Sequence, residues 1–234
     1  MLVSHLKEVA DDLLSLLYMD LCISCYEIEP ISTSPFCLSC IADIPYIDQQ
    51  SSIASLLIGK PSIPKEIANI YSLLTYAKSG KVKQLMHQLK YGGRAMIGVK
   101  LGEQLGRHFK MNEGTSHYQL IPVPLHPKRF RKRGYNQSNK IAEGIKNITK
   151  IEINPHVLKR IQNNESQTQM ALHERGEIHE KRFAVIEQAK CDTSKHIILV
   201  DDIITTGSTI AACYELLKKK GYHNISVATL AITI

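Results

Sequence analysis

The last third of the chain has the clearest pattern of hydrophobic and polar positions. An apolar run at residues 196–200 is followed by a helical pattern at 208–220 and by a second apolar run at 225–232. Gly221 follows the helical pattern, at the position where glycine commonly ends a helix. A strand, a helix and a strand in this order form a βαβ unit, which predicts a parallel sheet.

The middle of the chain predicts further elements. Apolar positions at helical or strand spacing indicate helices at 81–90, 95–110 and 137–147, and strands at 118–123 and 183–186. The polar segment 152–180 is longer than a simple connection, and loops of this length are usually functional or mobile. We therefore expect an α/β fold in which helices flank a central parallel sheet.

The first 65 residues differ from the rest of the chain. Leucines at helical spacing predict an amphipathic helix at 2–18, and three prolines in the polar segment 41–65 indicate a linker. Charged residues interrupt the leucines, unlike in a signal peptide, and no run of about 20 apolar residues could span a membrane. We expect a cytoplasmic protein without membrane insertion, in which residues 1–60 form a small unit before a domain at 61–234.

The composition adds a hydrophobic core and a basic surface to this picture. Hydrophobic residues make up 44% of the 234 positions, which is enough for a buried core. The formal net charge of +7 suits an anionic partner, such as a nucleotide, pyrophosphate or a nucleic acid. Net charge does not choose among these partners, and a basic surface without a function would give the same value.

Four of the six cysteines form two matching motifs. Cys22-x-x-Cys25 and Cys37-x-x-Cys40 are separated by eleven residues, and clustered cysteines in a reducing compartment are more often metal ligands than disulfides. Two such turns can place four thiolates around one point, so they predict a closed zinc site with a structural role. The loop between them has little apolar content, and zinc would supply folding energy on the order of 10–16 kcal/mol.

Two adjacent carboxylates, Asp201 and Asp202, stand at the end of the first apolar run. Small polar residues then lead into the predicted helix: Thr205, Thr206, Gly207, Ser208 and Thr209. A helix N-terminus offers unpaired N–H groups, hydroxyls add donors, and Gly207 permits close approach of an anion, so this segment predicts a phosphate-binding loop. Carboxylates at the carboxyl end of a strand can accept hydrogen bonds from a diol, and the combination indicates a ribose 5-phosphate. The magnesium site of an NTPase is disfavoured, because the chain has no G-x-x-x-x-G-K-[ST] loop.

A basic segment follows the strand expected at 118–123. Five of the six residues at 128–133 are basic, and we single out Lys128, Arg129 and Arg133. We expect a loop that neutralises a pyrophosphate or contacts a nucleic-acid backbone. A solvated basic face would have the same composition.

Several of these segments resemble known families. Residues 197–209 are similar to the phosphoribosyl pyrophosphate motif of type I phosphoribosyltransferases. Pro-Val-Pro-Leu-His-Pro at 122–127, followed by Arg-Gly-Tyr-Asn-Gln at 133–137, resembles the signature of the ComF (ComFC) competence family, which also carries a four-cysteine N-terminal element.

Weaker similarities to the ComF family lie elsewhere in the chain. Lys90-Tyr91-Gly92-Gly93 resembles a stretch of that family, although residues 81–90 otherwise indicate a solvated helix face. Lys159-Arg160 and the polar segment after it resemble the family's mobile loop, in which Ile178 stands where asparagine is usual.

The resemblance implies a type I phosphoribosyltransferase fold at 61–234, preceded by the zinc element. It also implies a ligand, phosphoribosyl pyrophosphate or ribose 5-phosphate, with Mg²⁺ bound beside the pyrophosphate. By this resemblance, Asp201 and Asp202 would hold the ribose hydroxyls, and Thr205 to Thr209 would hold the 5-phosphate. Lys128 and Arg129 would stabilise the departing pyrophosphate, and Arg133 would contact the substrate.

Two functions are open at this point. The first is a phosphoribosyltransferase that acts in DNA uptake and natural transformation on an unidentified acceptor. The second is a non-catalytic module of the same fold that binds single-stranded DNA or a nucleotide signal, with competence proteins as partners. Stacking aromatic side chains would favour the second function, and only Phe130 and Tyr135 are interleaved with the basic segment.

Overall fold

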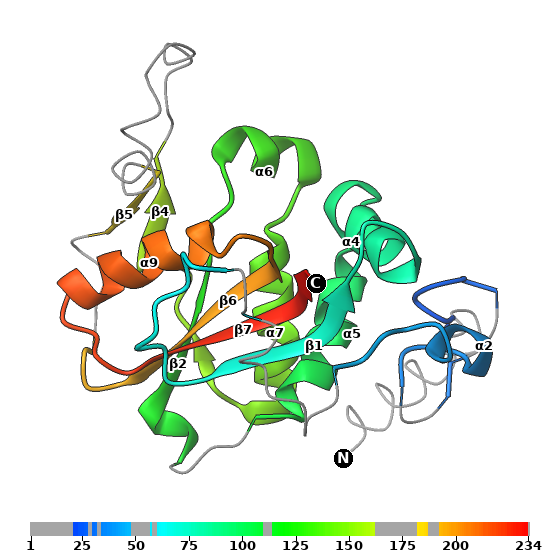
Figure 1. The fold of residues 1–234 in the computed structure, drawn as a ribbon, viewed down its shortest axis with the longest axis horizontal. Coiled ribbons are helices and arrows are strands. Elements are labelled where there is room, and N and C mark those ends of the chain that lie inside the picture. The colour runs from blue at the N-terminus through cyan, green and yellow to red at the C-terminus, as the bar shows by residue number, and fades with distance from the viewer. Residues whose placement is uncertain are drawn as a thin grey trace, which may run out of the picture. The chain divides into compact units, whose positions relative to one another are not determined.

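The computed structural model (Figure 1) describes residues 21–27, 30, 31, 34–47, 57, 60–109, 114–161, 182–186 and 192–233. The chain divides into two compact units between Ile44 and Pro45. The helix predicted at 2–18 and the ComF-like position Ile178 lie outside the described residues.

Five parallel strands form the central sheet of the larger unit. Their order across the sheet is β1 (Ile70–Tyr76), β7 (Ile225–Thr233), β6 (His196–Ile204), β2 (Tyr118–Pro122) and β3 (Glu152–Ile153). Eight consecutive residues of β7 are buried, as are residues 197–200 of β6. Such unbroken burial is typical of a parallel sheet with both faces covered. The predicted α/β fold with a central parallel sheet is confirmed.

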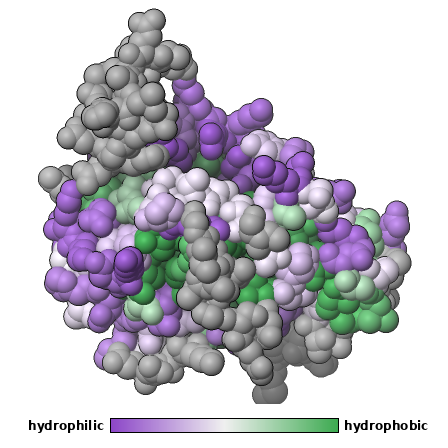
Figure 2. Space-filling view, viewed as in Figure 1, coloured by the Kyte–Doolittle hydropathy of each residue, from purple (hydrophilic) through white to green (hydrophobic). Residues whose placement is uncertain are grey.

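Helices cover this sheet from both sides. The helices that pack on it are α4 (Lys81–Tyr91), α5 (Ala95–Gly106), α7 (Gln137–Thr149) and α9 (Ser208–Lys219), while α6 (Pro127–Arg133) has no buried residue. In Figure 1, α9 lies in front of the sheet and α5 and α7 lie behind it. Figure 2 shows hydrophilic residues over much of the same view, with hydrophobic residues near its middle and at its lower right. Among the described residues, no helix is long and apolar enough to cross a membrane.

Glycines allow α5 and α7 to approach each other closely. A Cβ atom on Gly144 would lie 2.0 Å from the carbonyl oxygen of Val99, and one on Gly102 would lie 2.3 Å from that of Ile141. Neither position therefore accepts a larger residue without movement of the backbone. Since α7 also packs on β2 and β6, this contact fixes where the N-terminus of α7 lies relative to the end of β6.

Three strands are not predicted by the sequence pattern. β1 is a short apolar run without alternation, whose burial is confined to its three central residues. The other two, β3 and β4 (Leu158–Arg160), lie within the polar segment expected to be a loop from 152 onward, and that part of the expectation is wrong. β4 pairs with β5 (Phe183–Val185) in a separate antiparallel sheet, which confirms the strand predicted at 183–186.

The basic segment is a helix, so the prediction of a loop is wrong. Pro127 occupies the first turn of α6, where its missing N–H group costs nothing. His126 caps the helix, because its Nδ1 accepts a hydrogen bond from the Lys128 N–H at 3.1 Å. Gly134 ends it in the left-handed conformation, with φ of +78°, and donates its N–H to the Phe130 carbonyl at 2.7 Å.

Two residues of the predicted linker, Tyr46 and Lys60, contact strands of the sheet. Tyr46 forms an isolated antiparallel bridge with Leu74 of β1. The Lys60 ammonium group donates to the carbonyl of Thr233 at 2.7 Å. These residues therefore brace the edge of the sheet at β1 and the carboxyl end of β7.

Candidate functional site

The two adjacent acids lie near the carboxyl end of β6. The strand continues for two residues beyond Asp202, and threonines of β7 hold this part of the backbone. Thr229 Oγ1 donates to the Asp202 carbonyl at 3.0 Å, and Thr233 Oγ1 donates to the Thr205 carbonyl at 3.3 Å. Hydrogen bonds from a buried strand thus position the backbone that carries both carboxylates and the start of the following loop.

The loop at 205–207 leads directly into α9. Gly207 is the N-cap and has no side chain to cover the first turn, and the Ser208 N–H donates to Thr206 Oγ1 at 3.4 Å. The first turn of the helix can therefore present N–H groups to an anion. Gly207 has φ of +83°, and a Cβ atom there would lie 2.3 Å from Cγ1 of Ile63. Its backbone conformation and the contact with Ile63 therefore both require glycine at this position.

The two carboxylates have different environments. Asp201 accepts hydrogen bonds from the Ser138 hydroxyl at 3.3 Å and from the Asp202 N–H at 2.8 Å. Burial and the neighbouring charge of Asp202 nevertheless raise the pKa of Asp201 to about 7. Asp202 forms a salt bridge with Lys90, with 2.9 Å between Nζ and Oδ2. One acid is thus about half protonated near pH 7, whereas the other is ion-paired.

A cavity of about 370 Å³ lies beside these acids, and we call it the acid-pair cavity. Of the predicted site residues, six line it together: Arg129, Arg133, Asp201, Asp202, Thr205 and Thr209. The other four residues predicted for the ligand do not line it: Lys128, Thr206, Gly207 and Ser208. Two lysine or arginine side chains that were not predicted as site residues, Lys90 and Arg160, complete its wall. Four basic side chains against two acids make the cavity suitable for an anionic ligand.

Lys90 shows that the expectation of a solvated helix face at 81–90 is wrong at its last residues. The end of α4 is held by Tyr135, between α6 and α7, and by Gln137, the first residue of α7. The Tyr135 hydroxyl donates to the Leu89 carbonyl at 2.6 Å, and Gln137 Nε2 donates to it at 3.5 Å. The ComF-like stretch that begins at Lys90 was the only sequence signal for this position.

Arg160 belongs to β4 and enters the cavity from the side of the second sheet. Its guanidinium group lies 5.1 Å from the centre of the Phe183 ring. Burial and the nearby charges of Arg129 and Arg182 lower its pKa, while Asp201 acts in the opposite direction. An anion in the cavity would relieve this crowding of positive charges.

The remaining residues of the ComF-like segment at 133–137 have structural partners. Arg133 donates to Gln137 Oε1 at 2.8 Å and lies over the ring of Tyr91, 4.8 Å from its centre. Asn136 caps α7 by accepting the Ser138 N–H at 3.2 Å, and it donates to the Val123 carbonyl at 2.9 Å. The segment therefore joins β2, α4 and α7 around the cavity.

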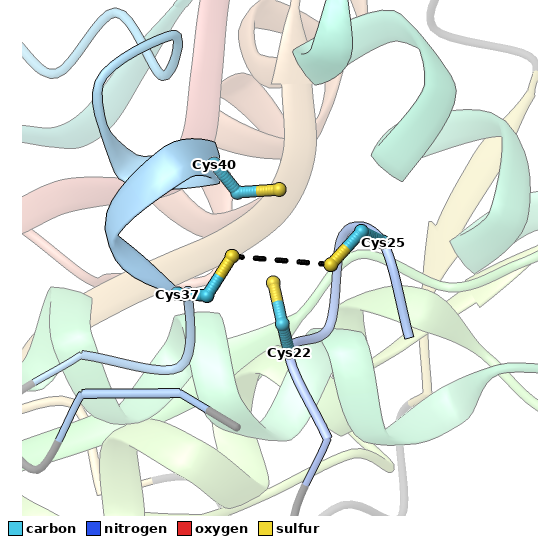
Figure 3. Close-up of side chains that lie close together, drawn as sticks. All are labelled: Cys22, Cys25, Cys37 and Cys40. Atoms are coloured by element: carbon cyan, nitrogen blue, oxygen red, sulfur yellow. Dashed lines mark hydrogen bonds between the residues drawn. The ribbon is translucent and has the colours of Figure 1, made fainter. Parts of the chain in front are cut away.

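The four clustered cysteines of the smaller unit converge on one point (Figure 3). All four sulfur atoms lie within 4.8 Å of one another, and those of Cys25 and Cys37 are 3.9 Å apart. Zinc–sulfur bonds of about 2.3 Å in a tetrahedron place sulfurs about 3.8 Å apart, so the four thiols fit a single zinc ion. Cys37 is the N-cap of α2 (Leu38–Ile41), and Cys40 lies within that helix.

The thiols of this cluster differ in acidity. A hydrogen bond with the Ser39 hydroxyl lowers the pKa of Cys37 to about 6, whereas burial raises that of Cys40 to about 11. A positive ion at the centre would favour the thiolate form of every member. The predicted zinc ligand set is thus brought together. Cys213, by contrast, is a buried core residue of α9.

Comparison with known proteins first defines the class. Residues 133–232 match the family described as "Phosphoribosyl transferase domain". The matched segment runs from the end of α6 to β7, and it contains both acids and the loop before α9. Together with the parallel sheet and its flanking helices, this match identifies a phosphoribosyltransferase fold.

Individual relatives then narrow the class. The chain is 26% identical to "Competence protein F" from Haemophilus influenzae over 90% of both chains. It is 27% identical to "DNA utilization protein YhgH" from Salmonella typhimurium, over 64% of this chain and 66% of that one. Identity to "Competence protein ComFC" from Bacillus subtilis is 28%, over 62% of this chain and 57% of that one. These relatives confirm the resemblance to the ComF family. The chain is thus phosphoribosyltransferase-like, and its N-terminal cysteine cluster fits a zinc element.

Proposed function

We propose that this protein binds phosphoribosyl pyrophosphate or ribose 5-phosphate in the acid-pair cavity, and that it transfers the phosphoribosyl group of phosphoribosyl pyrophosphate to an acceptor. The observation that carries the proposal is the convergence of Asp201, Asp202, the start of the loop before α9 and several guanidinium groups on one cavity. A phosphorylated sugar needs hydrogen-bond acceptors for its diol and positive charge for its phosphates. The cavity offers both within about 370 Å³.

Each part of the ligand has a counterpart among these residues. The 5-phosphate would lie at the N-terminus of α9, with hydroxyls from the segment Thr205–Thr209. The ribose hydroxyls would donate to Asp201 and Asp202, which requires the Asp202 carboxylate to be shared with Lys90 or released from it. The pyrophosphate would face Arg129 and Arg133, with Lys128 nearby on the same helix.

Transfer would break the bond between C1 of the ribose and the pyrophosphate oxygen, and the electron pair would leave with pyrophosphate. A nucleophilic atom of the acceptor would form the new bond to C1, and its proton would pass to solvent. Lys128 and Arg129 would stabilise the departing charge, while the two acids hold the sugar in place. Among the described residues that line the cavity, two are carboxylates and one of these is ion-paired, so they fit Mg²⁺ when oxygens of the ligand complete the set. Mg²⁺ bound in this way would supply further positive charge to the pyrophosphate.

The biological setting of the proposal is DNA uptake and natural transformation. It is supported by the names of the relatives, two of which are competence proteins and one a DNA utilization protein. We also propose that the four-cysteine cluster holds a structural zinc, because the closed set of four thiols leaves no position for a substrate.

A second function is favoured by the aromatic residues beside α6. Tyr91 and Phe130 are 58% and 48% exposed, and Arg133 lies over the Tyr91 ring. Basic side chains next to exposed aromatic rings suit single-stranded DNA. In this version the protein would be a non-catalytic module that works with competence proteins.

Calorimetry with phosphoribosyl pyrophosphate and Mg²⁺ tests the shared claim. We expect the double variant Asp201→Asn/Asp202→Asn to bind about 100-fold more weakly or worse, because two charge-assisted hydrogen bonds are lost. Asp192→Asn, which removes a carboxylate from a distant exposed turn, is the matched control and should bind as the wild type does. Equal affinity of the double variant would contradict the proposal.

A second pair of assays separates the two functions. Release of pyrophosphate with any member of a panel of bases and amines would establish a transferase. Absence of turnover, combined with salt-dependent binding of single-stranded DNA that is lost in Arg131→Ala/Arg133→Ala, would favour the binding module.

A further inference from the structure

An ion pair between two elements forms part of the wall of the acid-pair cavity. Lys90 Nζ, at the end of α4, lies 2.9 Å from Oδ2 of Asp202, near the end of β6. Both residues line the cavity, and their side chains are 25% and 15% exposed. A pair this sheltered from water is weakly screened, so it is stronger than a pair on the surface. A sugar hydroxyl that donates to Asp202 must therefore compete with the Lys90 ammonium group.

Both partners of this ion pair are held by the fold. Lys90 belongs to the last turn of α4, where the helix dipole favours a positive charge. That turn is fixed by the hydrogen bond from the Tyr135 hydroxyl to the Leu89 carbonyl at 2.6 Å. On the other side, Thr229 Oγ1 donates to the Asp202 carbonyl at 3.0 Å. The pair is thus part of the free protein and needs no ligand to form.

The charges around the pair make its separation costly. Besides Lys90, three basic residues line the acid-pair cavity: Arg129, Arg133 and Arg160. An ammonium group that left Asp202 would remain among these cations without its anion, and breaking a partly buried pair in this way is strongly unfavourable. Asp202 would also remain beside Asp201, with one cation fewer to offset the two acids. A ligand that separates the pair must therefore supply a negative charge for Lys90.

The two ligands of the proposed function differ in this respect. Ribose 5-phosphate carries a single phosphate, which would lie at the N-terminus of α9. Phosphoribosyl pyrophosphate adds a pyrophosphate, which would face Arg129 and Arg133 of α6. Arg133 lies over the ring of Tyr91, 4.8 Å from its centre, and Tyr91 directly follows Lys90. The end of α4 is thus on the pyrophosphate side of the cavity, where a pyrophosphate oxygen can replace the Asp202 carboxylate as the partner of Lys90.

We propose that Lys90 makes this cavity selective for phosphoribosyl pyrophosphate over ribose 5-phosphate. In the free protein its ammonium group occupies Asp202, and it releases this carboxylate to the ribose hydroxyls when a pyrophosphate oxygen takes the place of the acid. This inference rests on the proposed function and narrows its ligand to the activated sugar. It also couples the two parts of the ligand, because binding of pyrophosphate makes an acid available to the ribose.

Calorimetry on the wild type and two variants tests this assignment. Lys90→Met removes the ammonium group and keeps a long unbranched side chain. Lys83→Met is the matched control, because Lys83 is exposed on the same helix and does not line the acid-pair cavity. Each protein is titrated with phosphoribosyl pyrophosphate and with ribose 5-phosphate, both in the presence of Mg²⁺, and urea unfolding verifies that the variants are folded.

The two ligands should respond to Lys90→Met in opposite directions. We expect phosphoribosyl pyrophosphate to bind about 10-fold more weakly, because a charge-assisted hydrogen bond is lost. Ribose 5-phosphate should bind about 5-fold more tightly, because Asp202 is no longer occupied. Lys83→Met should bind both ligands as the wild type does. Loss of positive charge alone would weaken the binding of both anions, so unchanged or weaker binding of ribose 5-phosphate in Lys90→Met would overturn the inference.

A measurement on the wild type alone gives a second test, which does not depend on the folding of a variant. Saturating inorganic pyrophosphate should tighten the binding of ribose 5-phosphate about 5-fold, because it draws Lys90 away from Asp202. Two anions that do not share this cation should instead repel each other, so equal or weaker binding would contradict the inference. If the wild type binds both sugars equally well, the inference fails and the proposed function stands. If it binds neither sugar, the proposed function itself fails.

Discussion

Asp201→Asn removes a carboxyl group that the fold keeps in an unfavourable state. Burial and the charge of Asp202 raise its pKa from 3.8 to about 7. Between these two pKa values the folded protein binds more protons than the unfolded chain, so the contribution of Asp201 to stability falls as the pH rises through this window. Each unit of pKa shift corresponds to about 1.4 kcal/mol, and the loss between pH 5 and pH 8 comes to about 3 kcal/mol.

Asp201→Asn has no titrating group at this position, so its stability should not fall in this way between pH 5 and pH 8. We expect its free energy of unfolding, relative to wild type, to rise by about 3 kcal/mol between pH 5 and pH 8 in urea titrations. Asp192→Asn is the control, because hydrogen bonds from Ser194 lower the pKa of Asp192 and it stays ionised in both states over this range. A stability difference for Asp201→Asn that is equal at both pH values would refute the reasoning.

If Asp201→Asn is more stable than the wild type but binds the ligand more weakly, the role of Asp201 is to bind the ligand and not to stabilise the fold. A carboxyl group held near neutrality beside a second acid lowers stability in the free protein. Ribose hydroxyls that donate to it, and cations that accompany the ligand, would favour its ionised form. If Asp201 binds the ligand, Asp201→Asn should therefore lower the ligand affinity measured by calorimetry and raise the free energy of unfolding.

The parts of the fold that could be predicted are those whose signals are local. The apolar runs of β6 and β7 and the glycine after α9 adjoin one another in the chain, so their order alone indicates a parallel βαβ unit. β1 was missed because its seven residues carry no alternation and no strong turn signal before them. The basic segment was read by its charge, although Pro127 and Gly134 are typical limits of a short helix.

The candidate site also combines residues that are close in the sequence, which could be predicted, with residues that only the fold brings together. Asp201, Asp202, Thr205 and Thr209 come from one short segment, and they could be predicted because two acids followed by small polar residues are typical of a sugar-phosphate site. Lys90 and Arg160 reach the same cavity from α4 and β4. Periodicity shows which face of α4 is polar, but only tertiary packing shows that its last turn meets β6. The cysteines could be predicted from spacing alone, because both pairs form their own turns.

Three further variants test the zinc site, the helix contact and the end of α4. Cys37→Ser should lose the single zinc that we expect by mass spectrometry, together with thermal stability, whereas Cys213→Ser should keep the metal. Gly144→Ala should lower the free energy of unfolding in urea by about 1–3 kcal/mol, because its Cβ atom meets the backbone of α5. Tyr135→Phe removes the hydroxyl that holds the last turn of α4, so Lys90 should lose its fixed position. We expect stability to fall by about 1 kcal/mol and phosphoribosyl pyrophosphate to bind about 5-fold more weakly. If stability falls while calorimetry gives an unchanged affinity, the hydroxyl serves the fold alone, and Lys90 does not depend on it to act at the acid-pair cavity.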